Sequence, residues 1–112
     1  YNNIWSKIAD IVLPGQYYSE KEGTYTNKNQ IVQSTEIAVQ ALRRTRPEWQ
    51  ILSELSKALG GEYFFETIPQ IFDAMAVEVK AFSGLKFEDI KEVGVELKNK
   101  IEDTGMSLVK FH

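Results

Sequence analysis

The chain has 112 residues, no cysteine and a formal net charge of -3, and 43% of its residues are hydrophobic. This composition is typical of one globular domain or part of one, so extensive disorder is excluded. Without cysteine, disulfides, thiolate zinc sites and iron–sulfur ligation within the chain are excluded. The acidic balance and the lack of a basic stripe argue against nucleic-acid binding. Because no apolar run approaches the ~20 residues that span a bilayer, direct membrane insertion is not expected.

Few residues qualify as catalytic or metal-binding. The only histidine is His112 at the end of the chain, where a frayed terminus is expected. The acidic residues lie in polar stretches and are expected to be solvated. We therefore predict no catalytic residue and no metal ligand. Tyr1 is not a natural start residue, so we expect the chain to be cut from a longer protein.

The first part of the chain, residues 1–45, is predicted to be a strand and a loop. Residues 8–13 form a short β-branched apolar run that ends at Pro14-Gly15, which favours a buried strand. Residues 16–33 are polar and predict a long loop, with a short strand at residues 30–34. Residues 36–44 are predicted to be coil. The apolar run at residues 8–13 is expected to pair with another strand or with a second copy of the chain.

Residues 46–112 are mainly helical in pattern. Thr45-Arg46-Pro47-Glu48 predicts a capping box and a helix that ends at Gly60-Gly61. Thr67-Ile68-Pro69-Gln70 repeats this arrangement before a helix that runs to Phe82 and stops at Gly84. We expect the following side chains to be buried where the two helices meet: Trp49, Leu52, Leu55, Ile71, Phe72 and Met75.

The remaining residues give weaker signals. A short third helix is predicted over residues 87–93, a helical turn or two over residues 95–101, and a final strand over residues 106–111. The predicted fold class is α+β, a predominantly helical fragment with a short N-terminal strand and a long loop. Residues 1–45 and 46–112 are predicted to be two segments of the same single domain.

Several blocks of sequence resemble the molybdopterin oxidoreductase superfamily. The first blocks are Ala9-Asp-Ile-Val-Leu-Pro14, Glu22-Gly-Thr-Tyr-Thr-Asn27 and Val32-Gln33. The next block is Thr45-Arg-Pro-Glu-Trp-Gln-Ile-Leu52, which leads into a helix that ends at Leu59-Gly60. The resemblance covers residues 5–60 well and residues 61–90 more loosely. The ordered series of blocks is far more specific than any block alone.

In the family this region lies near the pterin cofactor, so the resemblance implies candidate cofactor-binding positions at Glu22, Gly23, Thr24, Asn27 and Gln33. These are family-matching positions that we expect to be vestigial, with Glu22, Thr24 and Asn27 tying the loop together. Many family members have Gly-Arg before Val-Gln, whereas this chain has Gln30-Ile31. Arginine is the natural partner of a pyrophosphate, and isoleucine cannot replace it. Bound molybdopterin is therefore not expected.

Three functions remain open at this stage. The resemblance favours a non-catalytic structural segment of the large iron–sulfur subunit of respiratory NADH–quinone oxidoreductase (complex I). Iron–sulfur clusters would lie upstream, the partners would be the rest of the subunit and other subunits, and the complex would lie on the cytoplasmic side of the inner membrane. The first alternative is a fragment of a catalytic molybdopterin or tungstopterin oxidoreductase such as formate dehydrogenase. The second alternative is an unrelated helical interaction module.

Overall fold

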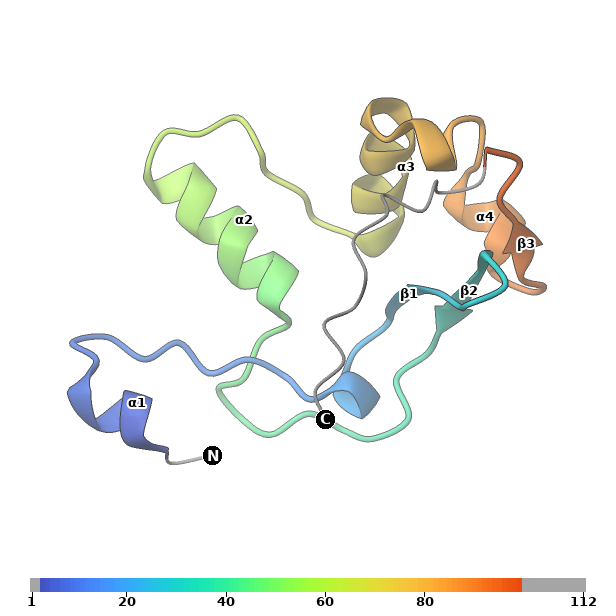
Figure 1. The fold of residues 1–112 in the computed structure, drawn as a ribbon. Coiled ribbons are helices and arrows are strands. Elements are labelled where there is room, and N and C mark those ends of the chain that lie inside the picture. Colours follow the sequence, from blue (N-terminus) through green and yellow to red (C-terminus); the bar gives the residue numbers. More distant parts are fainter. Residues whose placement is uncertain (1–2, 100–112) are drawn as a thin grey trace, which may run out of the picture.

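The computed structural model describes residues 3–99 and confirms the α+β fold class. Its helices and strands are α1 (Ile4–Ile8), β1 (Gly23–Thr26), β2 (Ile31–Thr35), α2 (Glu48–Ala58), α3 (Ile68–Glu78), α4 (Phe87–Ile90) and β3 (Val95–Glu96). Two 3-10 turns, η1 (Tyr18–Glu20) and η2 (Lys80–Phe82), join them. Figure 1 shows the sheet, α3 and α4 together on one side of the molecule and α1 and α2 on the other. No helix in residues 3–99 is long and apolar enough to cross a membrane.

The sheet is antiparallel, with the strand order β1-β2-β3. The strand predicted at residues 30–34 is confirmed as β2, shifted by one residue, but β1 lies in a stretch that was predicted to be loop. The Leu97 amide donates to the Gln30 carbonyl at 2.9 Å and extends the pairing of β3. Val32, at the centre of β2, is fully buried. The sequence did not predict β1 because its residues are mostly polar. Polar residues are common in such strands, since one face of an antiparallel hairpin remains in water.

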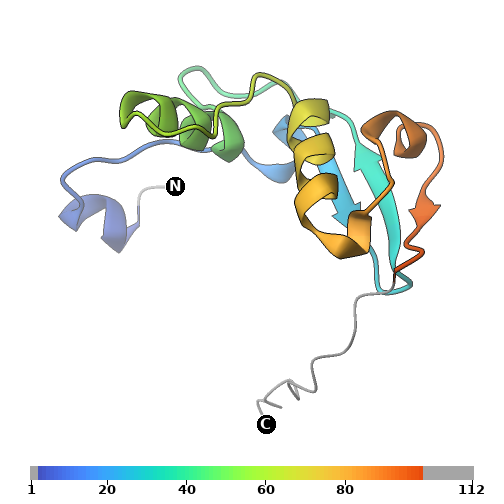
Figure 2. The ribbon, with the colours of Figure 1, turned by 90° about the horizontal axis from the view of Figure 1, so that it is seen from above.

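The core lies between the sheet and α3, which crosses the sheet in Figure 2. Phe72 of α3 is 3% exposed and makes edge contacts with the rings of Phe82 and Phe87, at centroid distances of 6.1 and 6.2 Å. Asp73 accepts a hydrogen bond from the Phe87 amide at 3.1 Å and so ties α3 to the start of α4. The buried hydrophobic residues are Val32, Ile68, Phe72, Ala76, Phe87, Ile90 and Leu97.

The two predicted helices form, but only one has the predicted cap. Thr67 accepts from the Gln70 amide at 3.4 Å and caps α3, as predicted, whereas the Gln70 side chain accepts from the Glu66 amide at 2.9 Å and not from Thr67. α2 begins only at Glu48, and the Thr45 hydroxyl donates back to the Leu42 carbonyl at 2.7 Å, so the capping box at Thr45 is wrong. The end of α2 is confirmed, because Gly60 has φ +76°. α3 ends at Glu78, four residues earlier than predicted, and η2 continues the chain.

The strand predicted at residues 8–13 is wrong. Residues 4–8 instead form α1, which begins where Asn3 accepts from the Ser6 amide at 3.0 Å. Residues 9–13 belong to no strand, and no strand in the described part of the chain pairs with them. Ile11 is 77% exposed. The expected pairing of this run within the chain is therefore absent from residues 3–99.

The predicted packing of α2 against α3 is also wrong in part. Phe72 is buried, and Trp49, Ile71 and Met75 are half-buried against the core. Leu52 and Leu55, however, are 64% and 47% exposed. α2 has the amphipathic pattern of a helix with one buried face, yet its leucines remain largely exposed in the described structure.

The last described residues differ from the predicted helical turns. The helix predicted over residues 87–93 is present but shorter, as α4. Val95 pairs with Val32 as part of β3, so the helical turn predicted after Gly94 is wrong. The strand predicted at residues 106–111 and the terminal His112 lie outside the described residues.

Candidate functional site

The hairpin of β1 and β2 carries most of the family-matching positions. In its register Thr24 faces Ser34 and Thr26 faces Val32, so these side chains share the face of the buried Val32. Tyr25 pairs with Gln33 on the opposite, outer face, because side chains alternate along a strand. Thr24 and Gln33 therefore lie on opposite sides of the hairpin.

Asn27 closes the hairpin. Its side-chain oxygen accepts from the Asn29 amide at 2.9 Å and from the Ile31 amide at 3.1 Å. Its own amide donates to the Ile31 carbonyl at 3.0 Å, and Gln30 completes the turn with φ +62°. This is the local side-chain-to-backbone bonding that favours Asn in turns. It supports the expectation that Asn27 ties the loop together.

Glu22 and Gly23 stand apart from these contacts. The Glu22 side chain is exposed. A Cβ built on Gly23 would meet no described atom within 4 Å, so no close approach requires glycine there. The structure thus places Gly23 and Thr24 in one strand, but it does not gather all five predicted positions into one cluster.

Ile31 stands where many family members have arginine, and its side chain makes an apolar contact. Ile31 and Gln33 flank Gly94 on the outer face, and a Cβ on Gly94 would come within 2.7 Å of the Ile31 Cγ2 atom and 2.9 Å of the Gln33 Cγ atom. The Ile31 side chain offers no hydrogen-bond donor, and its amide donates to the Asn27 oxygen within the turn. This position of the hairpin therefore presents an apolar side chain where many family members present a guanidinium. Within residues 3–99 no group of three or more metal-ligating side chains could hold an ion.

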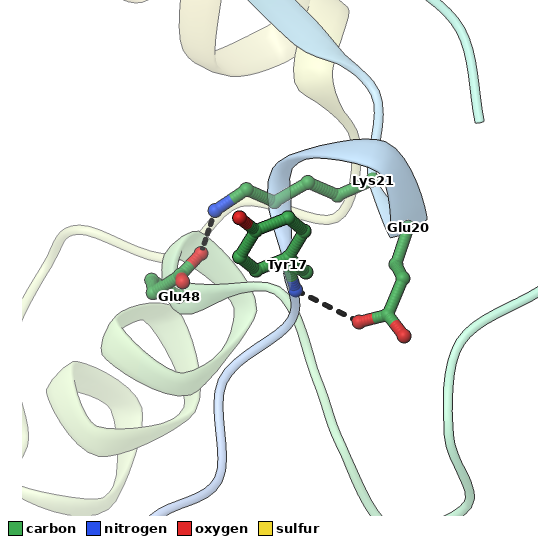
Figure 3. A network of polar contacts seen from close by, with 4 residues as sticks. All are labelled: Tyr17, Glu20, Lys21 and Glu48. Carbon is green, nitrogen blue, oxygen red and sulfur yellow. Dashed lines mark hydrogen bonds and ion pairs between the residues drawn. The ribbon is translucent and has the colours of Figure 1, made fainter. Parts of the chain in front are cut away.

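A polar network that the sequence patterns missed joins η1 to α2 (Figure 3). The Tyr17 amide donates to the Glu20 carboxylate at 2.8 Å, and the Lys21 ammonium pairs with the Glu48 carboxylate. The hydrogen bond from Lys21 holds the pKa of Glu48 below its ordinary value. Gly15 lies close to this carboxylate: a Cβ added at Gly15 would come within 3.0 Å of the Glu48 Oε1 atom. Lys21 and Glu48 are 27 residues apart, so no local spacing could have revealed the pair.

Residues of α2 also line a groove. The groove has a volume of about 460 Å³ and is lined by Leu13, Pro14, Arg44, Arg46, Ile51, Glu54 and Leu55. Arg46 forms an ion pair with Glu54, and the Arg46 amide donates to the Pro14 carbonyl at 3.2 Å. The groove is therefore lined by both apolar side chains and arginines.

Comparison with known proteins identifies the family. The molybdopterin oxidoreductase model matches residues 2–58, which include α1, the hairpin and α2. The chain belongs to the molybdopterin oxidoreductase family. This agrees with the sequence blocks at residues 9–14, 22–27 and 46–60. No solved structure matched the chain.

Individual relatives fall into two kinds of enzyme. The alpha subunit of F420-dependent formate dehydrogenase 2 from Methanococcus maripaludis is 36% identical over 93% of this chain. The mitochondrial 78 kDa subunit of NADH-ubiquinone oxidoreductase from Neurospora crassa is 34% identical over 87% of it. A putative formate dehydrogenase from Staphylococcus haemolyticus is 30% identical over 74%. The chain spans only 16%, 13% and 8% of the lengths of these three relatives.

Proposed function

We propose that this chain is a structural, non-catalytic segment of the large subunit of an NADH–quinone oxidoreductase. The observation that carries the proposal is Ile31, which stands where many family members have arginine and which packs against Gly94. An apolar contact at this position serves the fold, because it puts no guanidinium there for a pyrophosphate. The turn role of Asn27 supports the same view.

The proposal places the chemistry elsewhere in the subunit. Electrons would pass through iron–sulfur clusters upstream of this chain, since the chain has no cysteine to hold one. The segment itself would bind no molybdopterin. Its partners would be the rest of the subunit and the neighbouring subunits of a respiratory complex on the cytoplasmic side of the inner membrane. The similarity to the 78 kDa subunit over 87% of the chain supports this proposal.

A second candidate is a segment of a formate dehydrogenase catalytic subunit. The specific observation in its favour is the 36% identity to a formate dehydrogenase alpha subunit over 93% of the chain. In such an enzyme the outer face of the hairpin, with Gln33 and Tyr25, would be the side that meets the cofactor, because those side chains point away from the core.

The full-length subunit, purified with its partners, separates the two candidates. We expect NADH-dependent reduction of a quinone analogue, no formate oxidation, and molybdenum and tungsten far below one atom per subunit. Formate oxidation together with about one molybdenum or tungsten per subunit would refute the first candidate and establish the second. An Ile31→Arg variant serves as a control: under the first candidate it leaves the metal content unchanged.

A further inference from the structure

The turn at residues 42–45 carries two arginines that lack a counter-charge in the described part of the chain. Arg43 and Arg44 occupy the middle of the turn, and both are exposed. Within residues 3–99, neither guanidinium forms an ion pair. The chain as a whole has a formal net charge of -3, so this patch is opposite in sign to the rest of the chain.

Two sets of contacts fix the backbone of this turn. The Thr45 hydroxyl and the Thr45 amide both donate to the Leu42 carbonyl, at 2.7 and 3.2 Å. Directly after the turn, Arg46 pairs with Glu54 of α2 and so ties the chain to the helix. The two arginines therefore stand on a backbone that is already ordered, and a partner that binds them has little loop entropy to remove.

Arg44 adopts a backbone conformation that is costly for a residue with a side chain. Its φ is +71° at the third position of the turn, where glycine or asparagine is usual. This left-handed region is unfavourable for arginine. Residues held in such conformations cluster at binding and catalytic sites. Since stability gives no reason for arginine at position 44, the strain points to a binding role.

The neighbouring residue indicates the kind of partner. Leu42 opens the turn and is 72% exposed. Arginine is enriched at interfaces between proteins, where it lies beside apolar side chains. A guanidinium binds a carboxylate through paired, charge-assisted hydrogen bonds. The interior of one polypeptide seldom buries arginine, which favours a separately folded subunit over another part of the same chain.

We propose that the turn at residues 42–45 binds an acidic segment of a partner subunit. Arg43 and Arg44 pair with carboxylates of that segment, and Leu42 contacts an apolar side chain next to them. The inference goes beyond the proposed function and applies to both candidates, since the formate dehydrogenase and NADH-ubiquinone oxidoreductase relatives are both subunits.

Association of the full-length subunit with the partner subunits that co-purify with it tests the role of Arg44. Asparagine tolerates left-handed backbone, so Arg44→Asn keeps the turn and removes the charge. We expect the dissociation constant to rise about tenfold, because a charge-assisted contact is lost. Arg43→Gln, at a position without positive φ, should act in the same direction.

The matched control is Lys28→Asn. Lys28 is also exposed, lies at a turn and forms no ion pair within residues 3–99, so its replacement should leave the dissociation constant unchanged. A subunit that purifies without partners would overturn the proposal. So would an unchanged dissociation constant in both arginine variants, or an equal change in the control.

Carbodiimide coupling identifies the bound segment. Arg44→Lys places an amine at position 44, and carbodiimide joins an amine to a carboxylate in direct contact with it. We expect a link to an aspartate or glutamate of a partner subunit, and none from Lys28. A link to the subunit's own polypeptide would overturn the assignment, as would binding to vesicles of anionic phospholipid that Arg44→Asn abolishes.

Discussion

Phe72 offers the most direct test of the core. Its side chain is 3% exposed and lies between the rings of Phe82 and Phe87. Truncation of a buried Phe to Ala costs ~3–5 kcal/mol, because transfer free energy is lost and a cavity remains. Each aromatic edge contact adds ~0.5–1.5 kcal/mol beyond the buried area. Phe72→Ala should therefore fall in the upper half of the range, at about 4 kcal/mol.

The loss would be a large fraction of a total stability of ~5–15 kcal/mol. Urea unfolding followed by circular dichroism measures it, with Val77→Ala as the matched control. Val77 lies on the same helix but is 87% exposed, so its truncation should change the free energy of unfolding by less than ~0.5 kcal/mol. A loss below ~1 kcal/mol for Phe72→Ala, or similar losses for both variants, would refute this description of the core.

Three further predictions concern the hairpin and the network. Gln30→Gly should raise the free energy of unfolding by ~0.5–1 kcal/mol, because φ +62° is costly for a side chain; Gln33→Gly, in an extended strand, should lower it in the same urea titration. Gly94→Ala should cost ~1–3 kcal/mol by overpacking against Gln33, and faster amide exchange in β3 would report it. The pKa of Glu48 is lowered in the folded protein, so its ion pair with Lys21 stabilises the fold fully at pH values above the ordinary carboxyl pKa. This stabilisation is lost as the pH falls through the lowered pKa of the folded state. Glu48→Gln should remove that part of the acid dependence, an effect below ~1 kcal/mol at an exposed pair. An unchanged acid unfolding curve in Glu48→Gln would count against the pair.

Local patterns predicted the elements whose causes are local. Thr67 caps α3 because the acceptor and the amide lie in the same turn. Gly60 ends α2 because its φ of +76° is costly for residues with a side chain. β2 was found because its centre, Val32, is β-branched and apolar. For Thr67 and Gly60 the cause lies within the same helix end, and for β2 the residue types of the strand itself were sufficient.

The errors arose where the partner is distant or lies outside the described residues. The run at residues 8–13 has the composition of an interior strand, but a strand needs a neighbour and none is described. The stripe of Leu52 and Leu55 has helical periodicity, which cannot tell whether a covering surface is present. For the candidate site, the sequence named Asn27 correctly as a turn residue but could not show that the hairpin register separates Thr24 from Gln33.

The Ser19 carbonyl of η1 accepts from two amides, those of Ala38 and Val39, at 2.9 and 3.0 Å. One three-residue turn therefore positions the start of the long coil that leads to α2, whereas Gln40, directly after Val39, is exposed. Tolerance to inserted residues should differ sharply between the two places. Two glycines added after Gln40 should barely shift the urea midpoint, because lengthening a flexible loop costs little. The same two glycines within η1 should lower the midpoint clearly, since they would displace the carbonyl that both amides share.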